Sequence, residues 1–127
     1  ASDPSAGGTV EMLLDGTEGQ KMMDNLTMNE HGQVIIQEDP GNQAYLAKIW
    51  SYDIRRDKLT EIAQHDAALY TPGSAGFLTQ DEESSGIIDA AEIIDAGWYL
   101  LVQQTHLRGT DAELVEGGQL LAIRIKR

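Results

Sequence analysis

Four short stretches rich in large apolar side chains follow one another between residues 26 and 64, and in the first and third of them apolar and polar residues alternate. They are Leu26–Asn29, Val34–Gln37, Trp50–Ile54 and Leu59–Gln64. Alternation with a period of two is typical of a half-buried β-strand, and the segments between these stretches are rich in turn residues. Successive strands joined in this way pair antiparallel, so we expect a four-stranded meander.

A second, shorter unit follows. Trp98–Gln104 is the most hydrophobic stretch of the chain, and Gln119–Ile125 is a further expected strand after a polar loop at Thr105–Glu116. Residues Ile87–Ile94 contain two Ile pairs that suit either a strand or a helical turn, because periodicity does not separate the two in so short a run. Leu101–Gln104 repeats the pattern of residues 35–38, which indicates that the two units are alike.

A four-stranded antiparallel meander of this length matches one blade of a β-propeller. The expected fold is therefore all-β, with about two blades of a larger propeller. We expect a flexible lead-in at 1–8, a first blade with an N-terminal strand at 9–70, an acidic loop at 71–86 and a second, incomplete blade at 87–127. The short apolar run Thr9–Leu14 would either complete the second blade or belong to a preceding blade.

The charge balance narrows the possible partners. The chain has 127 residues, with 21 acidic and 9 basic side chains and a net charge of −12. Phosphates would be repelled, which argues against nucleic acid and an anionic membrane surface as partners. Cysteine is absent, so disulfides and thiolate ligands are excluded. The opening residues, without an initiator Met or a signal peptide, suggest an excised part of something longer.

Two bursts of negative charge follow apolar strands, at Glu38-Asp39 and at Asp81-Glu82-Glu83. In an up-and-down sheet the loop after the second strand and the loop that enters the next sheet lie at the same end. The side chains expected there are Asp24, Asn25, Glu38, Asp39, Asp81, Glu82 and Glu83. Calcium takes six to eight oxygen ligands of this kind, so these residues are candidate calcium ligands. His106 is placed at the same end.

Each of these features also has a simpler interpretation. The acidic runs alone would be solvated loops, and Pro, Gly and Asn beside Glu38-Asp39 are ordinary turn residues. Ser84 and Ser85 lack the glycine-flanked elbow of a serine nucleophile, so we expect them to hydrogen-bond within the loop. His31 is expected in a turn and His65 at a strand end. No catalytic residue is assigned.

Several segments also resemble the C-terminal part of the PhoX-type alkaline phosphatase family. The resemblance covers roughly residues 22–125, and the Gln-Asp-Glu-Glu-Ser-Ser-Gly string is its most distinctive part. It rests on Asp24–Thr27, Gln37–Asn42, Ile49–Asp53, Phe77–Gly86 and Glu113–Leu120. The resemblance implies a secreted or periplasmic β-propeller that binds calcium, and in characterised members iron, at the propeller axis and hydrolyses phosphate esters.

The chain departs from that family in two ways. Members are several hundred residues long, and their iron site uses a cysteine that this chain lacks. The resemblance therefore implies a segment that contributes acidic calcium ligands to a phosphoric monoester hydrolase and is inactive alone, with iron only in the complete parent. The alternatives are a non-catalytic calcium-binding segment and a module that associates through sheet edges, with the remaining blades or with further copies as partner.

Overall fold

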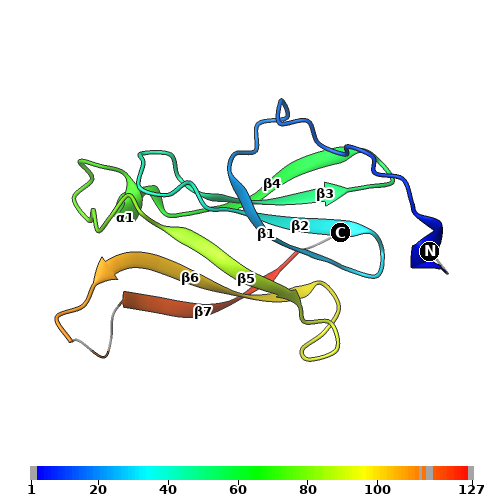
Figure 1. Cartoon of the computed structure of the whole chain (residues 1–127). Helices are drawn as coiled ribbons and strands as arrows, with labels where there is room; N and C mark the ends of the chain where they lie inside the picture. The colour runs from blue at the N-terminus through cyan, green and yellow to red at the C-terminus, as the bar shows by residue number, and fades with distance from the viewer. Residues whose placement is uncertain (1–2, 112, 114–115, 126–127) are drawn as a thin grey trace.

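The computed structural model describes residues 3–111, 113 and 116–125, and antiparallel β-strands dominate it (Figure 1). Sheet A has the strand order β1-β2-β3-β4. Its strands are β1 (Met23–Met28), β2 (Gln33–Glu38), β3 (Lys48–Asp53) and β4 (Lys58–Gln64). The predicted all-β class and the four-stranded meander are therefore confirmed.

Sheet B has three strands in the order β5-β6-β7, as expected for the second unit. They are β5 (Glu83–Asp89), β6 (Trp98–Arg108) and β7 (Glu116–Arg124). Residues Ile87–Ile94, for which the sequence suits either a strand or a helical turn, begin in β5 and end in a turn at 91–94. The polar loop predicted at 105–116 is longer than the observed one. β6 continues to Arg108, β7 begins at Glu116, and these two residues pair with each other.

Three further features differ from the sequence-based expectation: one loop boundary and two short helical turns. The acidic loop predicted at 71–86 ends earlier, since β5 begins at Glu83. A short helix, α1 (Ala67–Tyr70), follows β4 and begins at Asp66, whose carboxylate accepts a hydrogen bond from the Ala68 amide. A 3-10 turn, η1 (Pro4–Ala6), lies in the lead-in. No helix of the described residues has the length and apolar character needed to cross a membrane.

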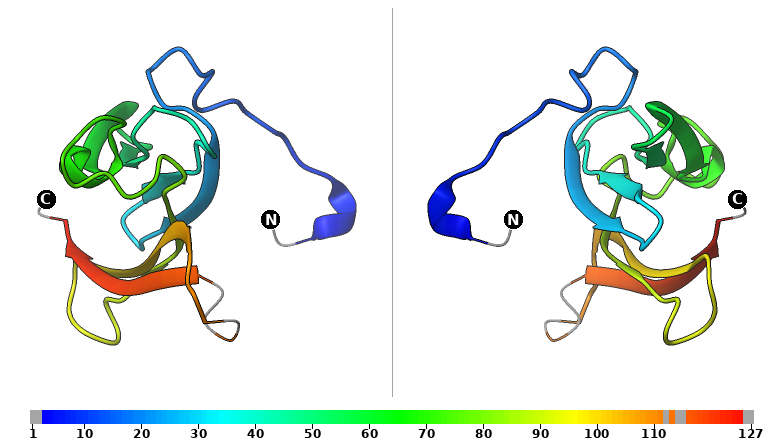
Figure 2. Two further views of the ribbon diagram at one scale, coloured as in Figure 1. Left: turned by 90° about the vertical axis from the view of Figure 1, so that its left-hand side faces the viewer. Right: turned by 90° about the vertical axis from the view of Figure 1, so that its right-hand side faces the viewer.

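The two sheets pack against each other through alternate residues of their facing strands (Figure 2). Ile35 and Ile49 of sheet A meet Ile87, Tyr99 and Leu101 of sheet B, and all five are buried. Fully burying a side chain of this size contributes roughly 1.5–3 kcal/mol. This shared core holds sheets A and B together. That the sheets are blades of a larger propeller stays a prediction.

The N-terminal segment does not form the predicted strand. Residues 9–14 pair with neither sheet, and the prediction that they complete the second blade is wrong. Val10 is fully exposed, and Figure 2 shows the segment leaving the body of the molecule. Contact begins at Leu13, and Leu14 packs on the outer face of sheet A against Ile36, Trp50 and Tyr52. That residues 9–14 belong to a preceding blade is a prediction that the structure leaves open.

Candidate functional site

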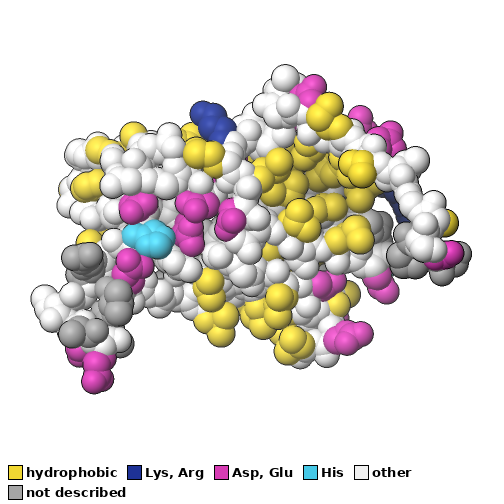
Figure 3. Space-filling view, in the orientation of Figure 1, with side chains coloured by type: hydrophobic (Ala, Val, Ile, Leu, Met, Phe, Trp, Pro, Cys, Tyr) yellow, Lys and Arg dark blue, Asp and Glu magenta, His cyan; other side chains and the backbone are white. Residues whose placement is uncertain are grey.

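The strand register brings the acidic segments to one end of the molecule. Met23 at the start of β1 lies opposite Glu38 at the end of β2, and Glu83 at the start of β5 lies opposite Gln104 near the end of β6. We call the group Asp24, Asp39, Glu83, His106 and Glu116 the acidic end. Figure 3 shows acidic side chains gathered around a histidine on the face of the molecule that it displays.

Glu83 lies at the centre of the acidic end. Burial raises the pKa of its carboxyl to about 7, and the hydrogen bond and negative charge of Asp39 act in the same direction. The charge of Asp24 also raises this pKa, and His106 lowers it. The Asp39 carboxylate is itself oriented by the amide of Gly41, which donates to Oδ1 at 3.0 Å. The negative charges of Asp39 and Asp24 thus oppose the ionisation of Glu83.

His106 connects Glu83 to a carboxylate that the sequence reasoning missed. Its Nδ1 lies 2.8 Å from Oε2 of Glu116, and its Nε2 lies 4.0 Å from Oε1 of Glu83. The residue has a positive φ of 40° where the β6–β7 pairing is irregular, between Gln104 and Arg108. Such an irregularity re-aims a side chain. The signal for Glu116 would have been a longer strand after Trp98. β6 continues past Gln104 to Arg108, and Arg108 pairs with Glu116.

Asn25 ties β1 to β5 beside this group. Its amide donates to the carboxylate of Asp24 and, at 3.2 Å, to Oγ of Ser85. Asp24, Asn25, Asp39 and Glu83 are thus the predicted ligands that the fold brings together.

Glu38 has a different environment. Its side chain is buried on the face of sheet A that the N-terminal segment covers, and both oxygens accept hydrogen bonds. The donors are the Lys21 amide at 2.6 Å, the Trp50 indole at 2.8 Å, the Lys48 amide at 2.9 Å and the Tyr45 hydroxyl at 3.2 Å. We assign Glu38 a structural role, because its oxygens are already occupied.

Glu82 is a buried carboxylate with a partner of its own. It lies just before β5, and only 1% of its surface is exposed. Burial raises the pKa of Glu82, whose Oε1 accepts from the Ala47 amide at 3.2 Å while Oε2 has no partner among the described residues. The Asp81 amide donates to Thr79 Oγ1 at 3.0 Å. Within the described residues, no three His, Asp or Glu side chains are arranged to hold a metal ion as they stand.

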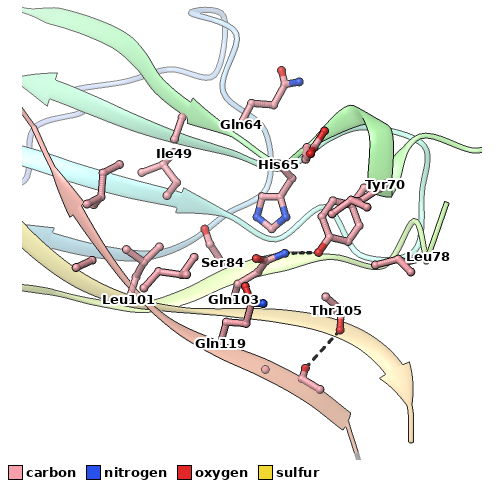
Figure 4. Close-up of a pocket in the computed structure, with 18 residues that line it drawn as sticks. Ile49, Gln64, His65, Tyr70, Leu78, Ser84, Leu101, Gln103, Thr105 and Gln119 are labelled. Atoms are coloured by element: carbon pink, nitrogen blue, oxygen red, sulfur yellow. Dashed lines mark hydrogen bonds between the residues drawn. The ribbon is translucent and has the colours of Figure 1, made fainter. Parts of the chain in front are cut away.

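A cavity of about 670 Å³ opens between the sheets beside α1 (Figure 4). His65 and Tyr70 line one wall, and Ser84 and Gln103 line the wall that faces them. The Tyr70 hydroxyl accepts a hydrogen bond from the Gln103 side-chain amide. The rings of His65 and Tyr70 meet edge to face with their centres 5.4 Å apart.

Sequence reasoning did not find this cavity. His65 does follow β4, as predicted for a strand-end residue, but its ring turns into the space between the sheets. Ser84 was expected to hydrogen-bond within a loop; it instead belongs to β5, and its hydroxyl has no partner among the described residues. Ser84 lies in sheet B and His65 directly follows the last strand of sheet A, so no local pattern connects them.

The fold and its ionisable groups thus define an antiparallel two-sheet protein with an acidic end and a separate cavity. Comparison with protein-family models, with curated proteins and with solved structures finds no match for this chain.

Proposed function

We propose that this chain is a segment of a calcium-binding β-propeller and that Asp24, Asp39 and Glu83 contribute oxygen ligands at the acidic end. The observation that carries the proposal is the strand register, which brings the segments of Asp24, Asp39 and Glu83 to one end of the molecule, where the charges of Asp24 and Asp39 raise the pKa of Glu83. None of the ion pairs among the described residues gives Asp24, Asp39 or Glu83 a Lys or Arg partner. Carboxylates in that situation favour a divalent cation, which offsets their repulsion.

The ligand set is incomplete within this chain. Calcium takes six to eight oxygens, whereas three carboxylates and the Asn25 amide beside them supply only part of that number. The remaining ligands would come from water and from neighbouring blades. In a phosphatase-like parent chain, bound calcium would offset the charge of a phosphate ester and polarise its phosphoryl oxygens. We propose that the segment alone is inactive.

A structural calcium site is the second candidate function. The observation that favours it is the Asn25–Ser85 hydrogen bond, which joins sheet A to sheet B directly beside Asp24. A cation held by Asp24 and Asp39 from sheet A and Glu83 from sheet B would cross-link the sheets at the same place. In that case calcium would stabilise the parent protein and contribute nothing to hydrolysis.

Thermal unfolding in calcium and in chelator tests the cation site. At a calcium concentration about 100 times the Kd, we expect stabilisation of about 2.7 kcal/mol and a Tm roughly 8–10 °C higher. Glu83→Gln and Asp39→Asn should remove that response. Glu92→Gln, in the exposed turn after β5, is the matched control and should keep it.

An unfolding curve that is identical in calcium and in chelator would contradict the cation site. If calcium stabilises the chain, an assay of phosphate ester hydrolysis on the complete parent separates the two candidates. Calcium-dependent hydrolysis that is lost in Glu83→Gln supports the phosphatase-like function, whereas calcium-dependent stability without hydrolysis supports the structural one.

A further inference from the structure

A groove of about 750 Å³ lies at the end of sheet A that is opposite the acidic end. Strand direction alternates in the meander, so the β1–β2 turn and the β3–β4 turn both lie at this end (Figure 1). The groove lining includes three of the nine Lys and Arg side chains of the chain, which are Arg55, Arg56 and Lys58. A strongly acidic protein therefore presents concentrated positive charge at one place.

The face of sheet A that is turned toward sheet B changes from apolar to polar at the groove. Ile35 and Ile49 on this face belong to the core that the two sheets share. The residues two positions further toward the groove, Gln33 and Ser51, line it instead, and the Gln33 side-chain amide donates to Ser51 Oγ at 2.8 Å. Polar groups of this kind are stabilised by water or by a polar ligand rather than by an apolar sheet.

The carboxylate in the groove lining, Asp53, is already bonded to the β3–β4 turn. Its Oδ1 accepts the Arg55 and Arg56 amides at 3.0 and 3.1 Å, and its Oδ2 accepts Arg56 Nη1 at 2.8 Å. Among the described residues, neither Arg55 nor Lys58 forms an ion pair with a carboxylate. The positive charges of these two side chains are therefore not balanced within the groove.

The carboxylates of the acidic end are too distant to cancel these charges. β2 runs from Gln33 in the groove to Glu38 at the other end of the sheet, a span of about 17 Å. At physiological ionic strength, charges are screened over about 8 Å. A small anion in the groove would therefore experience mainly the local cations, whereas a nucleic acid would extend over the acidic surface as well.

The two unbalanced cations suit an oxyanion that carries two charges. The Arg55 guanidinium presents a planar set of N–H donors that matches phosphate oxygens, and the Lys58 ammonium adds a compact charge. Arg55 lies in the short turn between β3 and β4, and Lys58 is the first residue of β4, so both charges act on one small region. A phosphate group concentrates its two charges on one set of oxygens, whereas a dicarboxylate spreads them over two groups.

We propose that this groove binds a doubly charged phosphate group, free or at the end of a small polar molecule, through the side chains of Arg55 and Lys58. The groove is separate from the acidic end, and the proposal does not depend on the calcium site. The competing interpretation is that Arg55 and Lys58 are solvated turn residues that attract every anion equally.

Amide chemical shifts of the full chain during titration with inorganic phosphate test the proposal. The titration is run at constant ionic strength and at pH 8, where phosphate carries about two charges. Calcium is first removed on a chelating resin, so that a cation at the acidic end cannot recruit phosphate. We expect saturable shifts in the β1–β2 and β3–β4 turns, with a Kd on the order of millimolar. Acetate, which carries one charge, should bind roughly fivefold more weakly.

Glycerol phosphate separates the two sources of the phosphate group. Tighter binding than that of inorganic phosphate supports an esterified ligand, whose organic part occupies the polar remainder of the groove. Weaker binding supports free phosphate. Glycerol without the phosphate should cause no saturable shifts in either turn.

Variants connect the phosphate to its proposed partners. Arg55→Gln and Lys58→Gln should each weaken phosphate binding roughly three- to tenfold, and the double variant should remove the saturable shifts. Arg124→Gln is the matched control. It removes the same charge from a side chain that stands 6.0 Å from the centre of the Trp98 ring and is not among the described lining residues, so the Kd should stay within about twofold.

Any of three results would overturn the proposal. The first is the absence of saturable shifts in the two turns of the folded wild type. The second is equal affinity for phosphate and acetate, which makes the cations a non-specific attraction for anions. The third is an equal loss of affinity in Arg55→Gln and Arg124→Gln, which assigns the effect to net charge and not to the groove.

Discussion

Glu38 and Glu82 are both buried carboxylates, and their surroundings differ sharply. Glu38 accepts four hydrogen bonds from backbone and side-chain donors, so its desolvation is offset. Glu82 accepts one, from the Ala47 amide, and burial raises its pKa. At the residue scale, the number of donors that reach a carboxylate decides its role. Glu38 anchors the N-terminal segment to sheet A.

His65 predicts a pH dependence of stability. Its pKa is about 4 in the folded protein and 6.5 in the unfolded chain. Above pH 6.5 both states hold a neutral ring, so His65 adds no pH dependence. As the pH falls from 6.5 to 4, the unfolded chain takes up a proton that the folded protein does not. Stability should therefore fall by about 2 kcal/mol over this window.

Urea unfolding of the wild type and of His65→Phe at pH 7 and pH 4.5 measures this effect. The wild type should lose about 2 kcal/mol more than the variant between the two pH values. His31→Gln is the control, since His31 is an exposed turn residue, and it should follow the wild type. Equal pH dependence in the wild type and His65→Phe would contradict the assignment of a buried neutral imidazole.

At the scale of elements, the N-terminal segment has two parts: an exposed part before Leu13 and a part from Leu13 onward that contacts sheet A. The Tyr52 hydroxyl donates to the Leu13 carbonyl at 3.4 Å, Leu14 joins the apolar cluster on sheet A, and Gln20 is buried. The Lys21 amide then donates to Glu38. Before Leu13, by contrast, Val10 and Met12 are largely exposed. The covering layer of sheet A therefore begins at Leu13.

Two truncations test this division. Removing residues 1–12 should change the Tm by no more than about 1 °C, because these residues bury little apolar surface. Removing residues 1–20 should lower the free energy of unfolding by on the order of 3 kcal/mol, because it uncovers Ile36 and Trp50 and removes Leu14. Circular dichroism during heating measures both. Equal effects of the two deletions would show that the segment stabilises the fold in some other way.

At the scale of the whole molecule, sheet B leaves one apolar face uncovered. Ile88 lies opposite Leu100, and Val102 lies opposite Leu120, on the face that points away from sheet A. Ile88 is 48% and Leu120 is 73% exposed. The outer face of sheet A has the N-terminal segment as its cover. Exposed apolar sheet faces and free strand edges favour association with another chain.

We therefore expect the full chain to self-associate in a concentration-dependent way. Leu120→Lys should weaken the association at least about tenfold, because it places a charge on the apolar face. Sedimentation velocity over a concentration series measures this. Met12→Lys, which changes an equally exposed apolar residue on the N-terminal segment, is the control and should behave like the wild type. A monomeric wild type at every concentration would contradict the expectation.

The strands of both sheets could be predicted from the sequence because period-two alternation is a local property of the chain. Leu26–Met28 and Trp50–Asp53 fall within β1 and β3 for that reason. Thr9–Leu14 has a similar local pattern and is not a strand. A strand also needs an edge to pair with, and only the folded molecule determines which edges the segment can reach.

The sequence also determined that the acidic segments lie at one end, since strand direction alternates in a meander. Tertiary structure alone decided which carboxylates meet. Glu82 is buried against the Ala47 amide while neighbouring Glu83 lies beside His106, and an irregular stretch of β6 turns His106 toward Glu116. The cavity likewise exists only because the two sheets face each other, since its polar groups come from both sheets and depend on packing that no local pattern encodes.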